Sequence, residues 1–140
     1  MSNNTSGEHC VQDSQIVRAM YGYWPSFHDA KLVGMEVELL ESDGINVANV
    51  NIRIRHKGQD NPKWVQPGPD CIVEFRFLDV SDENIVISHL SGGGWVDELI
   101  FKSKPDGRFE FDLTPSAGID MKFDCSLIRV VAIHTVSTTK

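Results

Sequence analysis

Apolar and polar residues alternate with a period of two along most of the chain after position 30. This period is typical of β-strands that bury one face. Turn-forming residues interrupt the pattern at short intervals, as they do in antiparallel β proteins. We predict about seven strands, which cover residues 35–39, 50–55, 72–78, 85–90, 95–102, 108–113 and 120–134. The pattern indicates a mainly β fold, either an antiparallel β-sandwich or a partly open barrel.

The chain before this pattern has a different period. Apolar residues at positions 16, 17, 20 and 21 fall on one face of a helix. We predict one short N-terminal helix over residues 12–21, with Asp13 or Ser14 as its cap and Gly22 at its end. Residues 1–11 are expected to form a flexible tail, and the 140 residues are expected to form a single domain.

A hairpin is predicted between the first two strands, because Asp and Gly follow each other at positions 43 and 44. If these strands pair, Glu36 and Glu38 would lie across from Arg53 and Arg55. Opposite charges in that arrangement would help to set the register of the two strands.

Residues 21–30 connect the predicted helix to the first strand, and we call this segment the hinge. It contains four aromatic residues, a proline and the only adjacent His-Asp pair of the chain. Proline keeps the residue before it out of a helix, so the helix ends before this point. We interpret the hinge as a structural element that closes the helix onto the sheet, and its structural residues are Trp24, Pro25, Phe27, His28 and Asp29.

The pair His28 and Asp29 is the first candidate for chemistry. A histidine beside a carboxylate can act as a general base with its orienting group, or as part of a metal site. Adjacent residues of an extended chain point to opposite faces, however, so we expect the two side chains not to share a site. We expect the backbone to hold His28, and Asp29 to cap a turn.

The other candidate residues lack the spacing of a catalytic or metal site. The three cysteines are odd in number and form no C-x-x-C pair, so we expect free thiols. The glycines at 92–94 lack the Lys-Ser/Thr end of a phosphate-binding loop and are interpreted as a turn that lets Trp95 pack. We therefore predict no enzyme activity, no metal and no cofactor. The alternative is a β-sandwich or barrel enzyme or small-ligand binder with a pocket near His28, Trp64 and Trp95.

The formal net charge of −7 and the isoelectric point near 5.1 restrict the choice of partner. Binding to phosphates needs a basic surface, so direct binding of nucleic acid is disfavoured, whereas an acidic surface suits a basic protein. No apolar run approaches the ~20 residues of a membrane helix, and residues 1–8 lack the features of a secretory signal. Together with free cysteines, this favours a cytoplasmic protein and leaves its oligomeric state open.

Residues 23–30, which contain the sequence W-P-S-F-H-D-A, follow a short predicted helix and precede a strand with alternating carboxylates. This arrangement resembles the Imm50-type immunity proteins of bacterial polymorphic toxin systems. Residues 75–77 and 123–133 look similar to the rest of that β-rich family. The resemblance implies a small cytoplasmic antidote that binds and blocks a cognate toxin domain, and it transfers no catalytic residues.

Contact residues follow from the charge of such a toxin. Toxins that act on nucleic acid carry basic clefts, so exposed carboxylates of the antidote would steer the encounter. We expect Asp97 and Glu98 to contribute, together with the acidic residues within 79–83 and 106–112. Trp64, in the long irregular segment 57–70, is the expected aromatic anchor.

Overall fold

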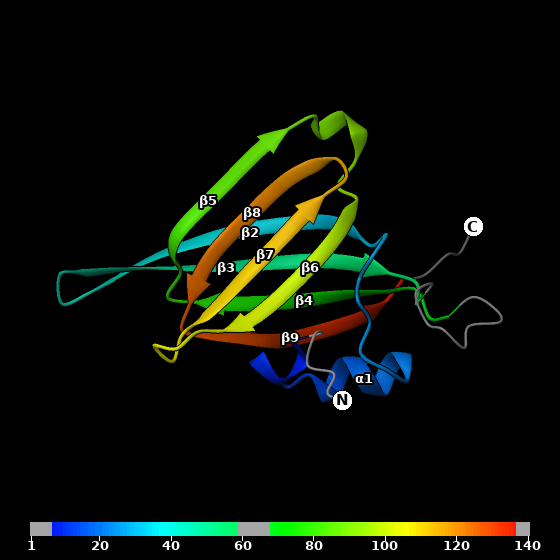
Figure 1. Ribbon diagram of the computed structural model, residues 1–140, viewed down its shortest axis with the longest axis horizontal. Helices are drawn as coiled ribbons and strands as arrows, with labels where there is room; N and C mark the ends of the chain where they lie inside the picture. Colours follow the sequence, from blue (N-terminus) through cyan, green and yellow to red (C-terminus); the bar gives the residue numbers. More distant parts are fainter. Residues whose placement is uncertain (1–6, 59–67, 137–140) are drawn as a thin grey trace.

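The computed structural model describes residues 7–58 and 68–136, and in this part of the chain two sheets are stacked face to face (Figure 1). The five-stranded sheet contains, in spatial order, β1 (Val11–Gln12), β9 (Leu127–Thr135), β4 (Cys71–Leu78), β3 (Ile45–His56) and β2 (Lys31–Ser42). The four-stranded sheet contains, in spatial order, β5 (Ser81–Ser88), β8 (Gly118–Cys125), β7 (Phe109–Pro115) and β6 (Val96–Ser103). The strands of the two sheets cross obliquely in Figure 1. The prediction of a mainly β sandwich is confirmed.

Nine strands form in the described residues, where the sequence predicted about seven. One reason is that the predicted strand 120–134 is divided between the two sheets, into β8 and β9. Ser126 lies where the chain passes from the four-stranded to the five-stranded sheet, and its amide donates to the carbonyl of Leu78 at 2.8 Å. Apolar residues continue on both sides of Ser126 without a glycine or proline, and for this reason the sequence predicted one strand. The other addition is β1, which pairs in parallel with β9.

The predicted hairpin of β2 and β3 is confirmed, and each strand is 12 residues long. Asp43 and Gly44 both have positive φ, 54° and 79°, which suits a tight hairpin turn. This turn fixes the register, so that Glu36 faces Asn51 and Glu38 faces Asn49. The predicted pairing of these glutamates with Arg53 and Arg55 is therefore wrong.

The helix α1 spans Gln15–Tyr21 and begins later than predicted. Residues 11 and 12 are taken up by β1, and Asp13 has a left-handed backbone with φ of 64°. The 3-10 helix η2 (Glu8–Cys10) precedes β1, so the prediction of a flexible tail is wrong for residues 7–11. The pairing of β1 with β9 and the burial of Cys10 hold this segment in place. Residues 1–6 of the predicted tail lie outside the described residues.

The Glu8 carboxylate joins η2 to α1. It accepts hydrogen bonds from the Arg18 guanidinium and from the Ser14 hydroxyl. The bond from Arg18 holds the pKa of Glu8 below its usual value. Because the Ser14 hydroxyl donates to Glu8, it does not accept a hydrogen bond from the first turn of α1, contrary to the prediction. Gly22 ends the helix as predicted, and its amide donates to the Arg18 carbonyl at 2.8 Å.

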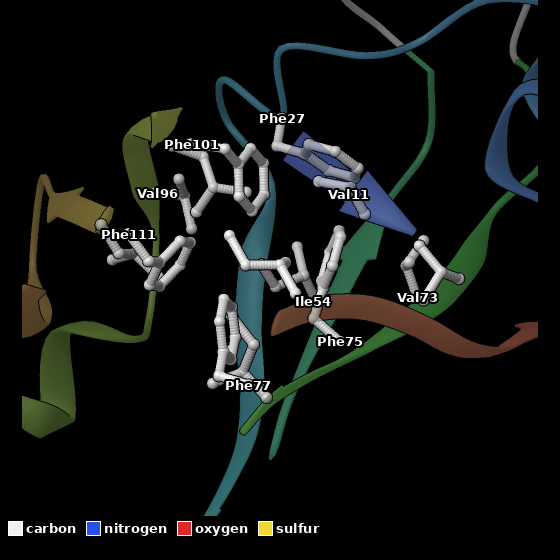
Figure 2. Close-up of a cluster of buried hydrophobic side chains, with 14 of the residues drawn as sticks. Val11, Phe27, Ile54, Val73, Phe75, Phe77, Val96, Phe101 and Phe111 are labelled. Carbon is white, nitrogen blue, oxygen red and sulfur yellow. The ribbon is translucent and has the colours of Figure 1, made fainter. Parts of the chain in front are cut away.

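Phenylalanine rings fill the space between the sheets. Phe75 and Phe77 of β4, the middle strand of the five-stranded sheet, meet Phe101, Phe111 and Phe123 of the four-stranded sheet. The ring centroids of Phe77 and Phe111 are 4.4 Å apart, and Figure 2 shows these two rings with Phe75 and Phe101 in the same cluster. All five rings are buried, so they supply a large share of the apolar area that stabilises the sandwich.

The three cysteines are free, buried thiols. Burial raises the pKa of Cys10 and Cys71, and it raises the pKa of Cys125 to about 12. Because the thiolate is the reactive form, we expect the native protein to react slowly with a disulfide reagent at neutral pH. When the protein is denatured without reductant, a spectrophotometric titration with the disulfide reagent should detect three free thiols at once. A count of one thiol would reveal a disulfide and contradict this assignment.

Candidate functional site

The hinge joins the two sheets at one corner of the sandwich. The Asp29 amide donates to the Val96 carbonyl at 2.9 Å, and the Val96 amide donates to the Ala30 carbonyl at 2.8 Å. The Leu32 amide donates to the Gly94 carbonyl at 2.7 Å. These three bonds hold the beginning of β2 against the beginning of β6, and we call residues 29–32 and 94–96 the corner.

Two glycines make this close approach possible. A Cβ atom at Gly94 would lie 2.5 Å from the carbonyl oxygen of Leu32, so any other residue would force the backbones apart. Gly93 has φ of 92° and ψ of −176°, a conformation that other residues rarely adopt. A Cβ atom there would lie 3.1 Å from the Trp95 ring nitrogen. The glycine run therefore serves close packing around Trp95.

The aromatic side chains of the hinge belong to the core. Phe27 is buried, and its ring lies with centroid distances of 5.8 Å from Trp24, 5.8 Å from Phe75 and 5.2 Å from His56. Its φ of 65° is left-handed, so the chain bends sharply at this residue. Pro25 is buried as well. Figure 2 shows the Phe27 ring lying over the sheet with the Phe75 ring beneath it.

His28 lies at the surface of the corner and is held by the backbone of β6. Its Nδ1 is 2.7 Å from the carbonyl oxygen of Asp97, and because a carbonyl only accepts, Nδ1–H is the donor. The Nε2 atom is 3.7 Å from an Asp29 carboxylate oxygen. The expectation that the two side chains point apart is wrong, because Asp29 has φ of 66° and the chain there is not extended.

A bulge in β6 places two carboxylates on the outside. Val96 pairs with Pro115 and Glu98 pairs with Thr114, so Asp97 is the extra residue. Val96 and Leu99 are buried, and the two acidic residues between them are both exposed. The bulge also frees the Asp97 carbonyl for His28. A cavity of about 370 Å³ lies beside it, between the hinge and β6.

Three of the other predicted carboxylates are engaged by neighbouring groups. Asp79 is paired with Arg108 at 3.1 Å, and Glu110 lies 3.7 Å from the Lys122 ammonium. The Asp106 carboxylate accepts from a backbone amide in its own turn. Among the ion pairs of residues 7–58 and 68–136, none involves Glu98. Asp82, Glu83 and Asp112 are likewise absent from these ion pairs, whereas the Asp97 carboxylate lies 3.7 Å from Nδ1 of His28.

Of the residues of the predicted pocket, the structure describes His28 and Trp95. Trp95 is exposed at the corner, and the Lys31 ammonium lies 5.5 Å from its ring centroid. Asp29, Lys31 and Trp95 line a cavity of about 280 Å³ with Arg55 and Lys57. Trp64 lies outside the described residues. Within the described ranges, no three His, Cys, Asp or Glu side chains are grouped to hold a metal ion, and no helix is long and apolar enough to cross a membrane.

Comparison with known proteins places these features in a family. The family model described as Immunity protein 50 matches residues 13–136, which run from two residues before α1 to one residue after β9. The chain belongs to this immunity protein family. No curated protein and no solved structure matched the chain.

In this immunity protein the W-P-S-F-H-D-A sequence is mainly a packing element. Trp24, Pro25, Phe27 and Ala30 are buried, whereas His28 and Asp29 are exposed. The sequence analysis missed the bond between His28 and Asp97, because 69 positions separate the two residues. It also missed the bulge, although two adjacent acidic residues inside an alternating strand break the period of two and were a signal for it.

Because Phe27 is buried and His28 is exposed, we expect substitutions at these two neighbouring residues to change the free energy of unfolding by different amounts. Phe27→Ala removes a buried ring and should lower the free energy of unfolding by about 3–5 kcal/mol. His28→Ala removes a surface hydrogen bond and should cost about 1 kcal/mol. Urea unfolding of both variants, with Leu90→Ala as an exposed control, measures the difference. Equal losses for Phe27→Ala and His28→Ala would mean that His28 organises the hinge.

Proposed function

We propose that this immunity protein is a cytoplasmic antidote that binds a cognate toxin domain stoichiometrically and catalyses no reaction. Family membership over residues 13–136 supports an immunity role. The observation that carries the binding mode is the pair of exposed carboxylates, Asp97 and Glu98, on the bulge in β6. Family membership and surface charge together favour a basic protein as the partner.

The acidic bulge would act on the rate of association. Exposed charges steer a partner over distances of roughly 8–10 Å at physiological ionic strength, and salt screens them. Asp97 also holds His28 through its backbone, so the bulge is fixed to the corner instead of moving with a loop. A fixed pair of charges presents the same field to every approaching toxin molecule, which favours a defined orientation of the encounter.

The enzyme alternative has less support. The cavity around Trp95 has Lys31, Arg55 and Lys57 in its lining. A thiol does lie beside a histidine, since Cys10 Sγ is 3.6 Å from His9 Nε2, but Cys10 is buried and burial raises its pKa. The exposed His28 donates to a backbone carbonyl, and the thiols are buried. Buried, protonated thiols are poor nucleophiles.

Growth rescue tests the function itself. Co-expression with a toxin domain encoded beside this gene should restore growth of cells that express the toxin, and the two proteins should elute together in gel filtration. A protein that forms no complex and instead turns over a small molecule would overturn the proposal.

Charge reversal tests the acidic bulge. Glu98→Lys should lower the association rate with the toxin about tenfold at low salt and flatten its dependence on salt. Asp120→Lys is the matched control, since it makes the same charge change at an exposed residue of β8, in the same sheet, and Asp120 is outside the expected steering residues. Equal changes in the association rate of the two variants, measured by stopped flow, would assign steering to the total charge of the protein. If neither variant changed the association rate, electrostatic steering would be excluded.

A further inference from the structure

The sandwich is open along one edge. The edge strands β2 and β5 belong to different sheets, and Figure 1 shows β5 and the 3-10 helix η3 (Leu90–Gly92) extending past β2. Val37 of β2 pairs with the buried Val50, and Ile87 of β5 pairs with Ile119, so both side chains face the space between the sheets. Yet Val37 is 48% exposed and Ile87 is 57% exposed. The interior of the sandwich is therefore accessible here.

A groove with apolar walls follows this opening. Its end near the corner is a cavity of about 230 Å³, and its nine lining residues are all apolar or glycine. Val33, at the bulge between Leu32 and Gly34, and Leu90 of η3 are exposed at its rim. We call this surface the edge groove and define it by Val33, Met35, Val37, Ile87, Leu90 and Ile119. A contiguous apolar surface of this kind is typical of a contact site.

The backbone beside the groove can accept a further strand. At its beginning β2 is paired on its outer side, through the Lys31–Trp95 bridge and the bond from Leu32 to Gly94. Beyond Val33, no strand of the described ranges pairs with this side of β2, which is the last strand of its sheet. Exposed strand edges bind extended peptides through main-chain hydrogen bonds, and adjacent pockets select the side chains.

The charges along β2 indicate what the added strand must carry. Glu36 and Glu38 are exposed on the outer face and alternate with Val37 on the groove side. If two copies of the protein paired about Val37, Glu36 of each copy would lie opposite Glu38 of the other. Like charges directly opposite are destabilising, so a second copy does not suit this edge. A strand with Lys or Arg at alternate positions suits this edge, because its positive charges would lie beside Glu36 and Glu38.

We propose that the outer edge of β2, from Val33 to Glu41, binds an extended segment of the toxin as an additional strand. The apolar side chains of that segment enter the edge groove, and its alternating Lys or Arg side chains lie beside Glu36 and Glu38. The inference rests on the proposed function and specifies the surface and the chemistry of the partner segment.

Hydrogen exchange of the full-length protein tests the edge directly. The probe is a synthetic peptide of about ten residues that alternates valine and lysine, long enough to follow β2. It should slow the exchange of amides between Val33 and Glu41, whereas a peptide alternating valine and glutamate should not. A peptide with the same valines and lysines in two blocks should also fail. Alternate amides of this range donate to β3 and exchange slowly in any case. Slow exchange of the other amides, which point away from β3, before any peptide is added would show that the chain covers its own edge, and would overturn the proposal.

Matched variants test the groove in the toxin complex. Val37→Asp places a charge on the groove side and should weaken the affinity about tenfold or more. Val86→Asp makes the same change at a residue that is 52% exposed on the outer face of β5, and should change affinity less than about twofold. Equal affinities of the two variants would overturn the edge site, as would a dimer of the free protein that Val37→Asp dissociates.

The two levels of the proposal fail differently. If the toxin complex forms but leaves the β2 amides exchanging as in the free protein, the edge site is wrong and the immunity function stands. If the valine–lysine peptide protects β2 but no toxin binds, the edge chemistry is supported while the toxin is excluded as its source.

Discussion

The contact of phenylalanine rings across the two sheets is the interaction on which the rest of the structure depends. Phe77 meets Phe111 and Phe123, and Phe75 meets Phe101, so the middle strand β4 is packed against the four-stranded sheet. The hinge extends this layer with Phe27, whose ring also contacts Phe75. Once the ring is buried, the hinge backbone lies beside β6 and can form the hydrogen bonds of the corner. The surface features at the corner are thus consequences of aromatic packing.

The sequence was most informative where one local rule decides the structure. The period of two and the Asp-Gly turn predicted the hairpin of β2 and β3. The composition of the hinge indicated a packing role, and Trp24 and Phe27 are buried. Prediction failed where distant contacts decide. The division of residues 120–134 depends on which sheet each half joins, and the order of residues 7–12 depends on β9, more than a hundred positions away. The wrong Glu-Arg pairing has a different cause. It was predicted from opposite charges, whereas the Asp-Gly turn fixes the register of β2 against β3.

Two bulges shape the surfaces of the candidate site, and both lie next to the corner. The bulge in β2 leaves Val33 exposed at the rim of the edge groove, and the bulge in β6 leaves Asp97 exposed. Between them the Leu32 amide donates to the Gly94 carbonyl at 2.7 Å, so both bulges lie beside a backbone contact between the two sheets. The local departures from strand geometry are therefore the means by which one sandwich presents an acidic and an apolar surface close together.

This proximity separates two properties of a complex that a single surface would combine. Charges at Asp97 and Glu98 lie in solvent, where they attract a partner before contact and lose strength when salt is added. In the proposed complex, the edge of β2 and the edge groove would act only at contact, through backbone hydrogen bonds and burial of apolar area, which salt does not screen. Affinity differences among related complexes arise mostly from dissociation rates. If the proposed complex forms in this way, selection for a new toxin would alter residues of the groove, such as Val37, and keep the acidic bulge.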